Sequence, residues 1–325
     1  MGKKLGIGIL SVIIILIIGY YGIGYYVFNI LTDVSGGCGQ PFMVDMLDNQ
    51  PDNFRSRYTI DGDFMDVSAY QMPIFDEVSF SSRGDDATLA AWFIPAVTSS
   101  DNVIIIVHGI NGCRREPTQL IPAGMLVNNG FNVLMIDLRN HGDSEITNGR
   151  LAAGNIEFRD VLGAIDYLNE QGYANDKIGL MGISLGAASA TIAFAEEATL
   201  PALFLDSPFS SIEDMVEEEF TRNGYPLFLM SPAFQIAVWN GIDFYEYSPN
   251  TAILNHQDRA IQIVHGEADT RIPIEQAIDL YELAGANAEL IRLPDLEHVE
   301  AIYNAQDIYE ELLVSFFTEA LNSGD

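Results

Sequence analysis

Acidic side chains are missing from the first 31 residues, although the whole chain contains 46 Asp and Glu against 15 Lys and Arg. Apart from Lys3 and Lys4, this segment carries no charged side chain at all. Residues 5–31 would form a helix about 40 Å long, which exceeds the roughly 30 Å hydrocarbon core of a bilayer. Because every side of this helix is apolar, residues 1–31 are predicted to be a transmembrane anchor.

A cleaved signal peptide and a buried core helix are the alternatives to an anchor. The apolar run is about twice as long as a signal-peptide core, and no small-residue cleavage site closes it. Lys3 and Lys4 before the run, with Asp33 and Asp45 after it, favour a cytoplasmic N-terminus. Aromatic rings with a polar tip, which suit the outer membrane interface, lie near its end: Tyr20, Tyr21, Tyr25 and Tyr26. We therefore expect a single-pass protein that contacts the lipid bilayer through residues 5–31 and holds its catalytic domain outside the cytoplasm.

Basic residues are scarce in the rest of the chain, and the net charge is −31. A surface this acidic repels phosphate backbones, so we expect no nucleic-acid partner. Acidic surfaces are common in proteins that meet high salt, and an extracytoplasmic location is an equally simple explanation.

Cysteine is rare too, since the chain has only Cys38 and Cys113. An oxidising compartment would permit a bridge, but the sequence does not give the Cα separation that a bridge requires. We expect both thiols to be unpaired and structural. Neither cysteine has a metal-ligand spacing and the five histidines are scattered singly, so no metal or cofactor site is predicted.

The middle and end of the chain alternate between short β-branched runs and helical stretches. Residues 32–70 show no sustained period and are interpreted as a membrane-proximal stalk, whereas residues 71–325 are interpreted as one catalytic domain. Eight candidate strands are found at 75–82, 89–96, 103–108, 131–138, 177–183, 201–205, 261–265 and 288–293. We expect an α/β fold with a mostly parallel, doubly wound sheet of about eight strands, the first two forming an antiparallel edge.

Residues 209–258 interrupt this alternation with aromatic side chains set among polar ones. We expect a short helical insert between the sixth and seventh strands, which forms a lid over a site at the C-terminal strand ends. The alternative is that its aromatic residues pack on the sheet and shape no pocket.

The predicted strand 177–183 runs into Ser184, and a run of small residues follows. Gly182 and Gly186 flank the serine in a G-x-S-x-G pattern placed between a strand and a helix, as a nucleophile on a very tight turn requires. The five-residue pattern alone is weak, since chance supplies it in roughly one chain in ten of this length. The strand before it and the helix after it make it specific.

A serine nucleophile needs a base and an acid later in the chain. His298 follows the last predicted strand, and Asp269 lies in the loop after the strand before it. His298 would take the proton of Ser184 while Asp269 orients its ring. Asp206, at the end of another strand, is the alternative acid, and an exposed loop histidine or a turn aspartate are the structural interpretations of His298 and Asp269.

The backbone N–H groups of Leu185 and Ile110 are the predicted oxyanion donors. Ile110 lies in the turn His108-Gly-Ile-Asn-Gly, where His108 is interpreted as structural, as is His141 in a later loop. Arg114 and Arg115 are candidates for binding a substrate carboxylate, and surface ion pairs with the abundant acids are the simpler alternative.

Residues 75–320 resemble the α/β-hydrolase superfamily, nearer its compact esterase and serine-aminopeptidase-like branch than its large-cap lipases. The resemblance rests on four pieces in order: His108-Gly-Ile-Asn-Gly, Asp137-Leu-Arg-Asn-His-Gly-Asp-Ser, Gly182-Ile-Ser-Leu-Gly, and the loops of His265-Gly-Glu-Ala-Asp269 and His298. One departure is Asn140, where many relatives carry glycine. The resemblance implies cofactor-free hydrolysis of an ester, thioester or amide in a small-molecule acyl substrate, through an acyl-enzyme on Ser184. A serine peptidase or acyltransferase would use the same residues, and a membrane-tethered binding protein on a hydrolase scaffold is the non-enzymatic alternative.

Overall fold

An eight-stranded sheet with strand order β10-β9-β8-β7-β5-β6-β4-β3 forms the centre of the molecule. The computed structural model describes residues 2–34, 38, 46–256 and 258–322. Strands β5 to β10 are mutually parallel, whereas β4 is antiparallel to both β6 and β3 at one edge. The strands are β3 (Asp76–Ser81), β4 (Thr88–Ile94), β5 (Val103–Val107), β6 (Asn132–Ile136), β7 (Ile178–Ile183), β8 (Ala202–Asp206), β9 (Ala260–Gly266) and β10 (Ala288–Leu293). The predicted fold class and its antiparallel edge are confirmed.

Helices cover both faces of this sheet, which explains the continuous apolar runs of its central strands. Helices α3 (Phe158–Glu170), α4 (Leu185–Glu196) and α8 (Ile274–Ala284) share one buried cluster with alternate strand residues such as Ile105. Helices α2 (Pro117–Asn128) and α10 (Gln306–Asn322) share the other, which contains Ile104. The short elements η3 (Asn175–Lys177), η6 (Gly285–Asn287) and α9 (Ala301–Asn304) lie in the connections.

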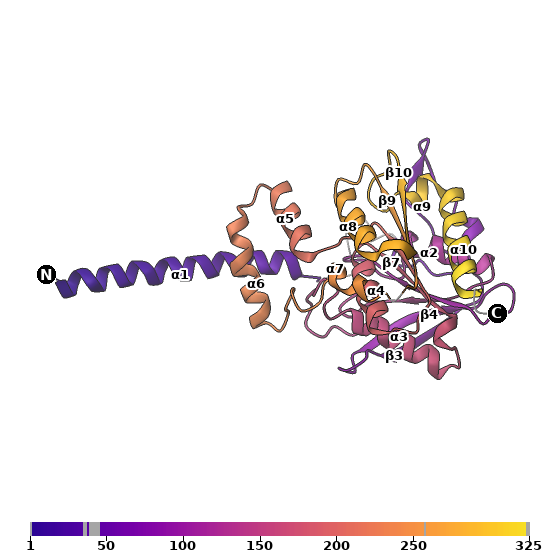
Figure 1. Cartoon of the computed structure of the whole chain (residues 1–325), viewed down its shortest axis with the longest axis horizontal. Helices are drawn as coiled ribbons and strands as arrows, with labels where there is room; N and C mark the ends of the chain where they lie inside the picture. The colour runs from indigo at the N-terminus through magenta and orange to yellow at the C-terminus, as the bar shows by residue number, and fades with distance from the viewer. Residues whose placement is uncertain (1, 35–37, 39–45, 257, 323–325) are drawn as a thin grey trace.

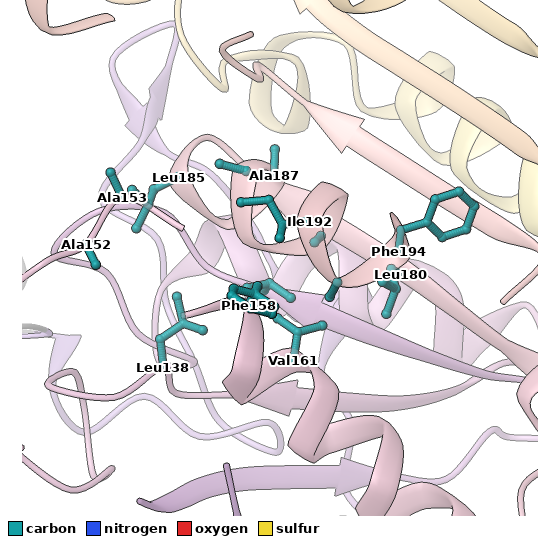
Figure 2. Close-up of a cluster of buried hydrophobic side chains, with 14 of the residues drawn as sticks. Leu138, Ala152, Ala153, Phe158, Val161, Leu180, Leu185, Ala187, Ile192 and Phe194 are labelled. Atoms are coloured by element: carbon teal, nitrogen blue, oxygen red, sulfur yellow. The ribbon is translucent and has the colours of Figure 1, made fainter. Parts of the chain in front are cut away.

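Helix α4 follows the candidate nucleophile and is buried along most of its length. Its alanines allow it to lie close to β7, and Figure 2 shows Ala187 and Ile192 of α4 in one buried cluster with Phe158 and Val161 of α3. Close packing of this kind fixes the start of α4, and with it the position of Ser184, relative to the sheet.

Helix α1 (Gly2–Thr32) extends as a long rod away from the sheet (Figure 1). Its part from Gly6 to Thr32 is long and apolar enough to cross a membrane, a property that membrane anchors and signal sequences share. Only its end is buried against the domain, where Phe28 is enclosed and Arg150 bonds to Asn29 Oδ1 at 2.5 Å.

The described residues from 46 to 70 contain short regular elements. A two-stranded hairpin forms from β1 (Thr59–Ile60) and β2 (Asp63–Phe64), and a 3-10 turn, η2 (Ser68–Tyr70), follows. Phe54, Met65 and Val67 are buried in the same cluster as α2 and α10. The division of the chain at residue 70 stays a prediction, but the described residues from 46 onward pack on the sheet.

The insert between β8 and β9 contains α5 (Ile212–Arg222), η4 (Leu227–Leu229), α6 (Met230–Trp239), α7 (Pro249–Ala252) and η5 (Ile253–Asn255). Helices α5 and α6 stand apart from the sheet beside the second half of α1 (Figure 1). The rings of Trp239 and Tyr21 lie 5.1 Å apart, and Pro232 lies so close to Gly24 that a side chain there would collide with it. The insert therefore packs partly on the apolar helix, a partner that its own sequence does not indicate.

The expectation that the cysteines are unpaired is wrong. Cys38 and Cys113 form a disulfide, with their Cα atoms 5.0 Å apart and a sequence separation of 75. The N–H of Cys38 also donates to the carbonyl of Asn111, so Cys38 lies against the turn that follows β5. The fold thus brings together two cysteines whose spatial distance could not be inferred from the sequence.

Removing this bridge should destabilise the fold. A cross-link that closes a loop of this length lowers the conformational entropy of the unfolded chain. In the chain-entropy model this adds about 4 kcal/mol to the free energy of unfolding. Denaturant unfolding of Cys38→Ser/Cys113→Ser protein in detergent should show that loss, and reduced wild-type protein should match it. Equal unfolding midpoints with and without reductant would contradict the pairing.

Candidate active site

Ser184 sits on a strained turn between β7 and α4. Its φ is +54°, a left-handed value that side chains other than glycine rarely adopt. A Cβ on Gly182 would collide with Ala187, and one on Gly186 would collide with the carbonyl oxygens of Val107 and His108. Glycine is therefore required at both positions, because any side chain there would prevent α4 from beginning so close to the strand ends.

Ser184, His298 and Asp269 lie in hydrogen-bonding contact. His298 Nε2 is 3.0 Å from Ser184 Oγ, and His298 Nδ1 is 2.7 Å from Asp269 Oδ2. Asp269 Oδ1 also accepts the N–H groups of Arg271 and Ile272, each at 2.8 Å. Three loops after different strands thus meet at the C-terminal edge of the sheet, as the sequence order predicts.

The environment of Asp269 favours its charged form. Burial alone would raise the pKa of this carboxyl, but hydrogen bonds from His265 and His298 outweigh burial and hold the pKa well below its ordinary value. His265 Nε2 lies 3.3 Å from Asp269 Oδ2. The sequence pattern assigned no role to His265, although this residue lies near the end of β9 and only four positions before Asp269.

Asp206, the alternative acid, contacts other groups. Its carboxylate accepts hydrogen bonds from Tyr309 at 2.8 Å and from Ser207 Oγ at 2.9 Å. Ser207 Oγ in turn accepts the N–H of Val299, the neighbour of His298. Burial raises the pKa of Asp206. Asp206 is therefore linked to the loop of His298 through Ser207. The acid that contacts the imidazole ring is Asp269.

The turn after β5 passes close to the nucleophile. A Cβ on Gly109 would lie 3.4 Å from Ser184 Cβ, and Ile110 lines both cavities that reach the serine. Leu185 lines one of them. The two predicted oxyanion donors thus flank Ser184, and their role in binding an oxyanion stays a prediction.

His108 and His141 are part of the scaffold. His108 is buried, and burial lowers its pKa to about 3, so the ring is neutral. Its Nδ1 donates to the carbonyl of Gly109 at 2.8 Å, and its Nε2 accepts the N–H of Leu138 at 3.0 Å. His141 Nδ1 lies 2.8 Å from the carbonyl of Arg139. These contacts agree with the structural interpretation of both histidines.

Two cavities meet at Ser184. The smaller has a volume of about 340 Å³ and is lined by polar residues such as Arg57, Tyr58 and Glu116. The larger has a volume of about 460 Å³ and is mostly apolar. Its wall includes Ile30 and Leu31 from the end of α1, Ile212, Met215 and Val216 from α5, and Phe244. The serine therefore faces two cavities that both expose more apolar than polar surface, and the larger one takes part of its wall from α1 and α5.

Arg114 and Arg115 do not line either cavity. Both guanidinium groups pair with Asp143 at 2.7 Å, and Arg114 also lies over the Trp92 ring at 4.6 Å. The ion-pair interpretation therefore fits and the substrate-binding one does not. The arginines at the two cavities are Arg57 and Arg271, with Arg222 at the larger one. Arg271 follows Asp269 by two positions and could have been inferred from that loop, whereas no pattern marks Arg57.

Among the described residues, no group of three or more His, Cys, Asp and Glu side chains is arranged to hold a metal ion.

The sheet order, the strained serine after β7 and the two downstream loops define the class, an α/β-hydrolase fold of the serine-hydrolase type. A family model described as the prolyl oligopeptidase family matches residues 122–324. The chain therefore belongs to the prolyl oligopeptidase family, Peptidase_S9. The matched region contains Ser184, Asp269 and His298.

Two curated relatives show the range of the similarity. The uncharacterized protein YfhR of Escherichia coli strain K12 is 29% identical over 253 residues, which cover 76% of this chain and 82% of YfhR. The lysophosphatidylserine lipase ABHD12 of Bos taurus is 27% identical over 203 residues, which cover 59% of this chain and 48% of the lipase.

Solved structures show the same fold. The esterase Pf2001 of Pyrococcus furiosus has a TM-score of 0.63 at 22% identity and covers 77% of this chain and 93% of its own. The acylaminoacyl peptidase of Pyrococcus horikoshii has a TM-score of 0.55 at 18% identity and covers 76% of this chain and 41% of its own. Esterases and peptidases thus share this architecture, and the fold does not separate their substrates.

Glu116, which precedes α2 and lines the smaller cavity, gives a pH-dependent prediction. Burial raises its pKa to about 7 from 4.5, and Asp137 acts in the same direction. The folded state therefore favours the protonated carboxyl, and this contribution to stability is lost as the pH rises from about 4.5 through about 7. Glu116→Gln should be more stable than wild type at about pH 8, with a smaller difference at about pH 5. Urea unfolding at both pH values measures this, and a difference independent of pH would contradict it.

Proposed function

We propose that this protein is a membrane-anchored serine hydrolase that cleaves a carboxylic ester through an acyl-enzyme on Ser184. The observation that carries the proposal is the continuous contact from Ser184 Oγ through His298 to the Asp269 carboxylate, at 3.0 Å and 2.7 Å. A serine hydroxyl becomes a competent nucleophile only with a base in such contact, and the base must itself be oriented.

In the proposed reaction, Ser184 Oγ attacks the acyl carbon while His298 Nε2 accepts the hydroxyl proton. The oxyanion is stabilised by the N–H groups of Leu185 and Ile110, each worth on the order of 3 kcal/mol of barrier. When the ester C–O bond breaks, His298 returns the proton to the leaving alcohol and the acyl group stays on Ser184. Asp269 holds the Nδ1–H tautomer and stabilises the imidazolium.

Water then attacks the acyl-enzyme with His298 again as the base. The carboxylic acid leaves and the serine hydroxyl is restored. No step in this sequence needs a cofactor, since each proton and each leaving group is handled by Ser184, His298 or water.

An ester is the proposed substrate because of the apolar cavity and the relatives. A mostly apolar space of about 460 Å³ beside Ser184 suits the acyl chain of an ester. The lipase among the relatives is named for a lysophospholipid, which is an acyl ester. A serine peptidase is the second candidate, and the family description and the acylaminoacyl peptidase fold favour it.

Two features support anchoring with the domain outside the cytoplasm. Helix α1 has the length and composition of a transmembrane segment, with lysines only at its start. The Cys38–Cys113 disulfide supports the same orientation, because such bridges persist mainly in oxidising compartments.

A fluorophosphonate probe should label the wild-type protein covalently at Ser184, and Ser184→Ala should abolish the labelling. Ser189→Ala is a matched control, because Ser189 is a buried serine on the next turn of α4 and should leave labelling unchanged. Labelling that survives Ser184→Ala would overturn the assignment. Turnover of p-nitrophenyl esters against aminoacyl amides by the same samples then separates esterase from peptidase.

Protease added outside intact cells should digest the catalytic domain, because the proposed orientation exposes it there. Lysed cells provide the control that the domain is cleavable. Full protection in intact cells together with cleavage after lysis would reverse the orientation.

A further inference from the structure

The insert contains a stretch of unusual composition. Residues 225–242 include no charged side chain, although acids and bases make up 19% of the chain. The helix before the stretch, α5, is rich in acids, and Asp243 follows it directly. Large apolar side chains in the stretch are exposed: Tyr225, Leu227, Phe228, Val238 and Trp239, with Phe228 at 65% and Trp239 at 63%. Exposure of this kind in so acidic a protein marks a surface that is covered in use.

The position of the stretch identifies what covers it. Helix α6 lies against α1 rather than on the sheet, with Trp239 beside Tyr21 and Pro232 beside Gly24. Figure 1 shows α6 crossing α1 instead of running along it. A helix that crosses a transmembrane segment lies near the plane of the membrane, as interfacial helices do.

The depth agrees with this placement. At 1.5 Å per residue, a helix starting at Leu5 covers the roughly 30 Å hydrocarbon core after about 20 residues, which brings it to Gly24. The contacts with α6 are therefore made where α1 leaves the core. Tyrosine and tryptophan are the residues that favour this level of a membrane, and Tyr21 and Trp239 meet there.

The larger cavity at Ser184 has part of its wall close to the same level. Two of its wall residues, Ile30 and Leu31, belong to α1, and Ile30 is only six positions past Gly24, or about 9 Å along the helix. Another part of the wall comes from α5, through Ile212, Met215 and Val216. An acyl chain at the membrane surface would thus meet apolar side chains of α1 and α5 on its way to the serine, with Glu219, Arg222 and Arg271 also in the lining.

We propose that residues 225–242 dock into the lipid bilayer beside α1, and that the substrate is a bilayer-resident acyl ester whose chain reaches Ser184 through the cavity between α1 and α5. This rests on the proposed hydrolase function. The bilayer is the occupant because the exposed apolar surface is continuous with the segment that spans it. Hydrolysis breaks the acyl C–O bond with one water, releasing a fatty acid and the polar alcohol.

Docking can be tested without catalysis, because the chain has two tryptophans in contrasting places. Trp92 is fully buried in the domain, whereas Trp239 is exposed on the docking surface. In full-length protein reconstituted into phosphatidylcholine vesicles, lipids brominated near the headgroup end of their chains should quench about a third or more of the emission. Trp239→Phe, which retains only Trp92, is the control and should show no quenching. Equal wild-type emission in brominated and ordinary vesicles would overturn the docking.

The route is tested by comparing two substrates. Phe228→Glu should lower turnover of a long-chain monoacyl ester held in vesicles by about tenfold, because a charge resists entering the interface, while hydrolysis of soluble p-nitrophenyl acetate stays unchanged. Phe64→Glu is the matched control, since Phe64 is 70% exposed on the β1–β2 hairpin and should change neither rate. Unchanged turnover of the vesicle substrate in Phe228→Glu would overturn the route.

Failure of the inference can be told apart from failure of the proposed function. If the wild-type protein hydrolyses neither substrate and is not labelled by the fluorophosphonate, the proposed hydrolase function is overturned. Quenching of Trp239 does not depend on Ser184, so it tests the docking separately. Acetate hydrolysis reports folding of each variant, and Leu227→Gln serves as a milder second variant on the same surface. Its vesicle turnover should fall with its acetate turnover unchanged.

Discussion

The close approach of α4 to the carboxyl end of β5 is the constraint on which the site depends. Gly186 lies against the carbonyls of Val107 and His108, and no larger residue fits there. This contact forces Ser184 into its left-handed conformation, at a cost of order 1–3 kcal/mol. The turn containing Ile110 lies beside the serine, and Ile110 lines both cavities that reach it. Nucleophile, oxyanion turn and substrate space thus follow from one packing contact.

The buried guanidinium of Arg139 is paired with two carboxylates. Arg139 lies between Asp160 at 2.6 Å and Asp85 at 2.5 Å, which ties the loop after β6 to α3 and to the β3–β4 edge. Asn140 takes φ +64°, a value that asparagine tolerates better than most residues. Its side chain accepts the N–H groups of Thr147 and Gly149, so the departure from glycine adds bonds to the loop. Paired in this way, Arg139 orients these loops without leaving its own buried charge alone.

The sheet and the three site residues could be predicted because their signals are local or ordered. Each buried strand is an apolar run of the right length, and Ser184, Asp269 and His298 each follow a strand in the order that this fold uses. The disulfide, the contacts of Arg114 and the packing of α6 on α1 depend on segments far apart in the chain. The composition could not show that Arg114 forms an ion pair with Asp143. It also could not show that Arg57, from the segment before the sheet, lines the same cavity as Ser184. The periodicity of apolar residues predicts which face of a helix or strand is buried, but it does not show which other element packs against that face.

The end of α1 is held to the domain at three kinds of contact: Arg150 bonds to Asn29, α6 crosses the helix, and the disulfide at Cys38 follows within six residues of Thr32. A flexible stalk would let a catalytic domain swing and tumble above a membrane. Attached as it is here, the domain keeps one orientation relative to the helix axis. Under the proposed anchoring, the helix would therefore fix the distance of Ser184 from the membrane, and a change in its tilt would move the mouth of the site with it.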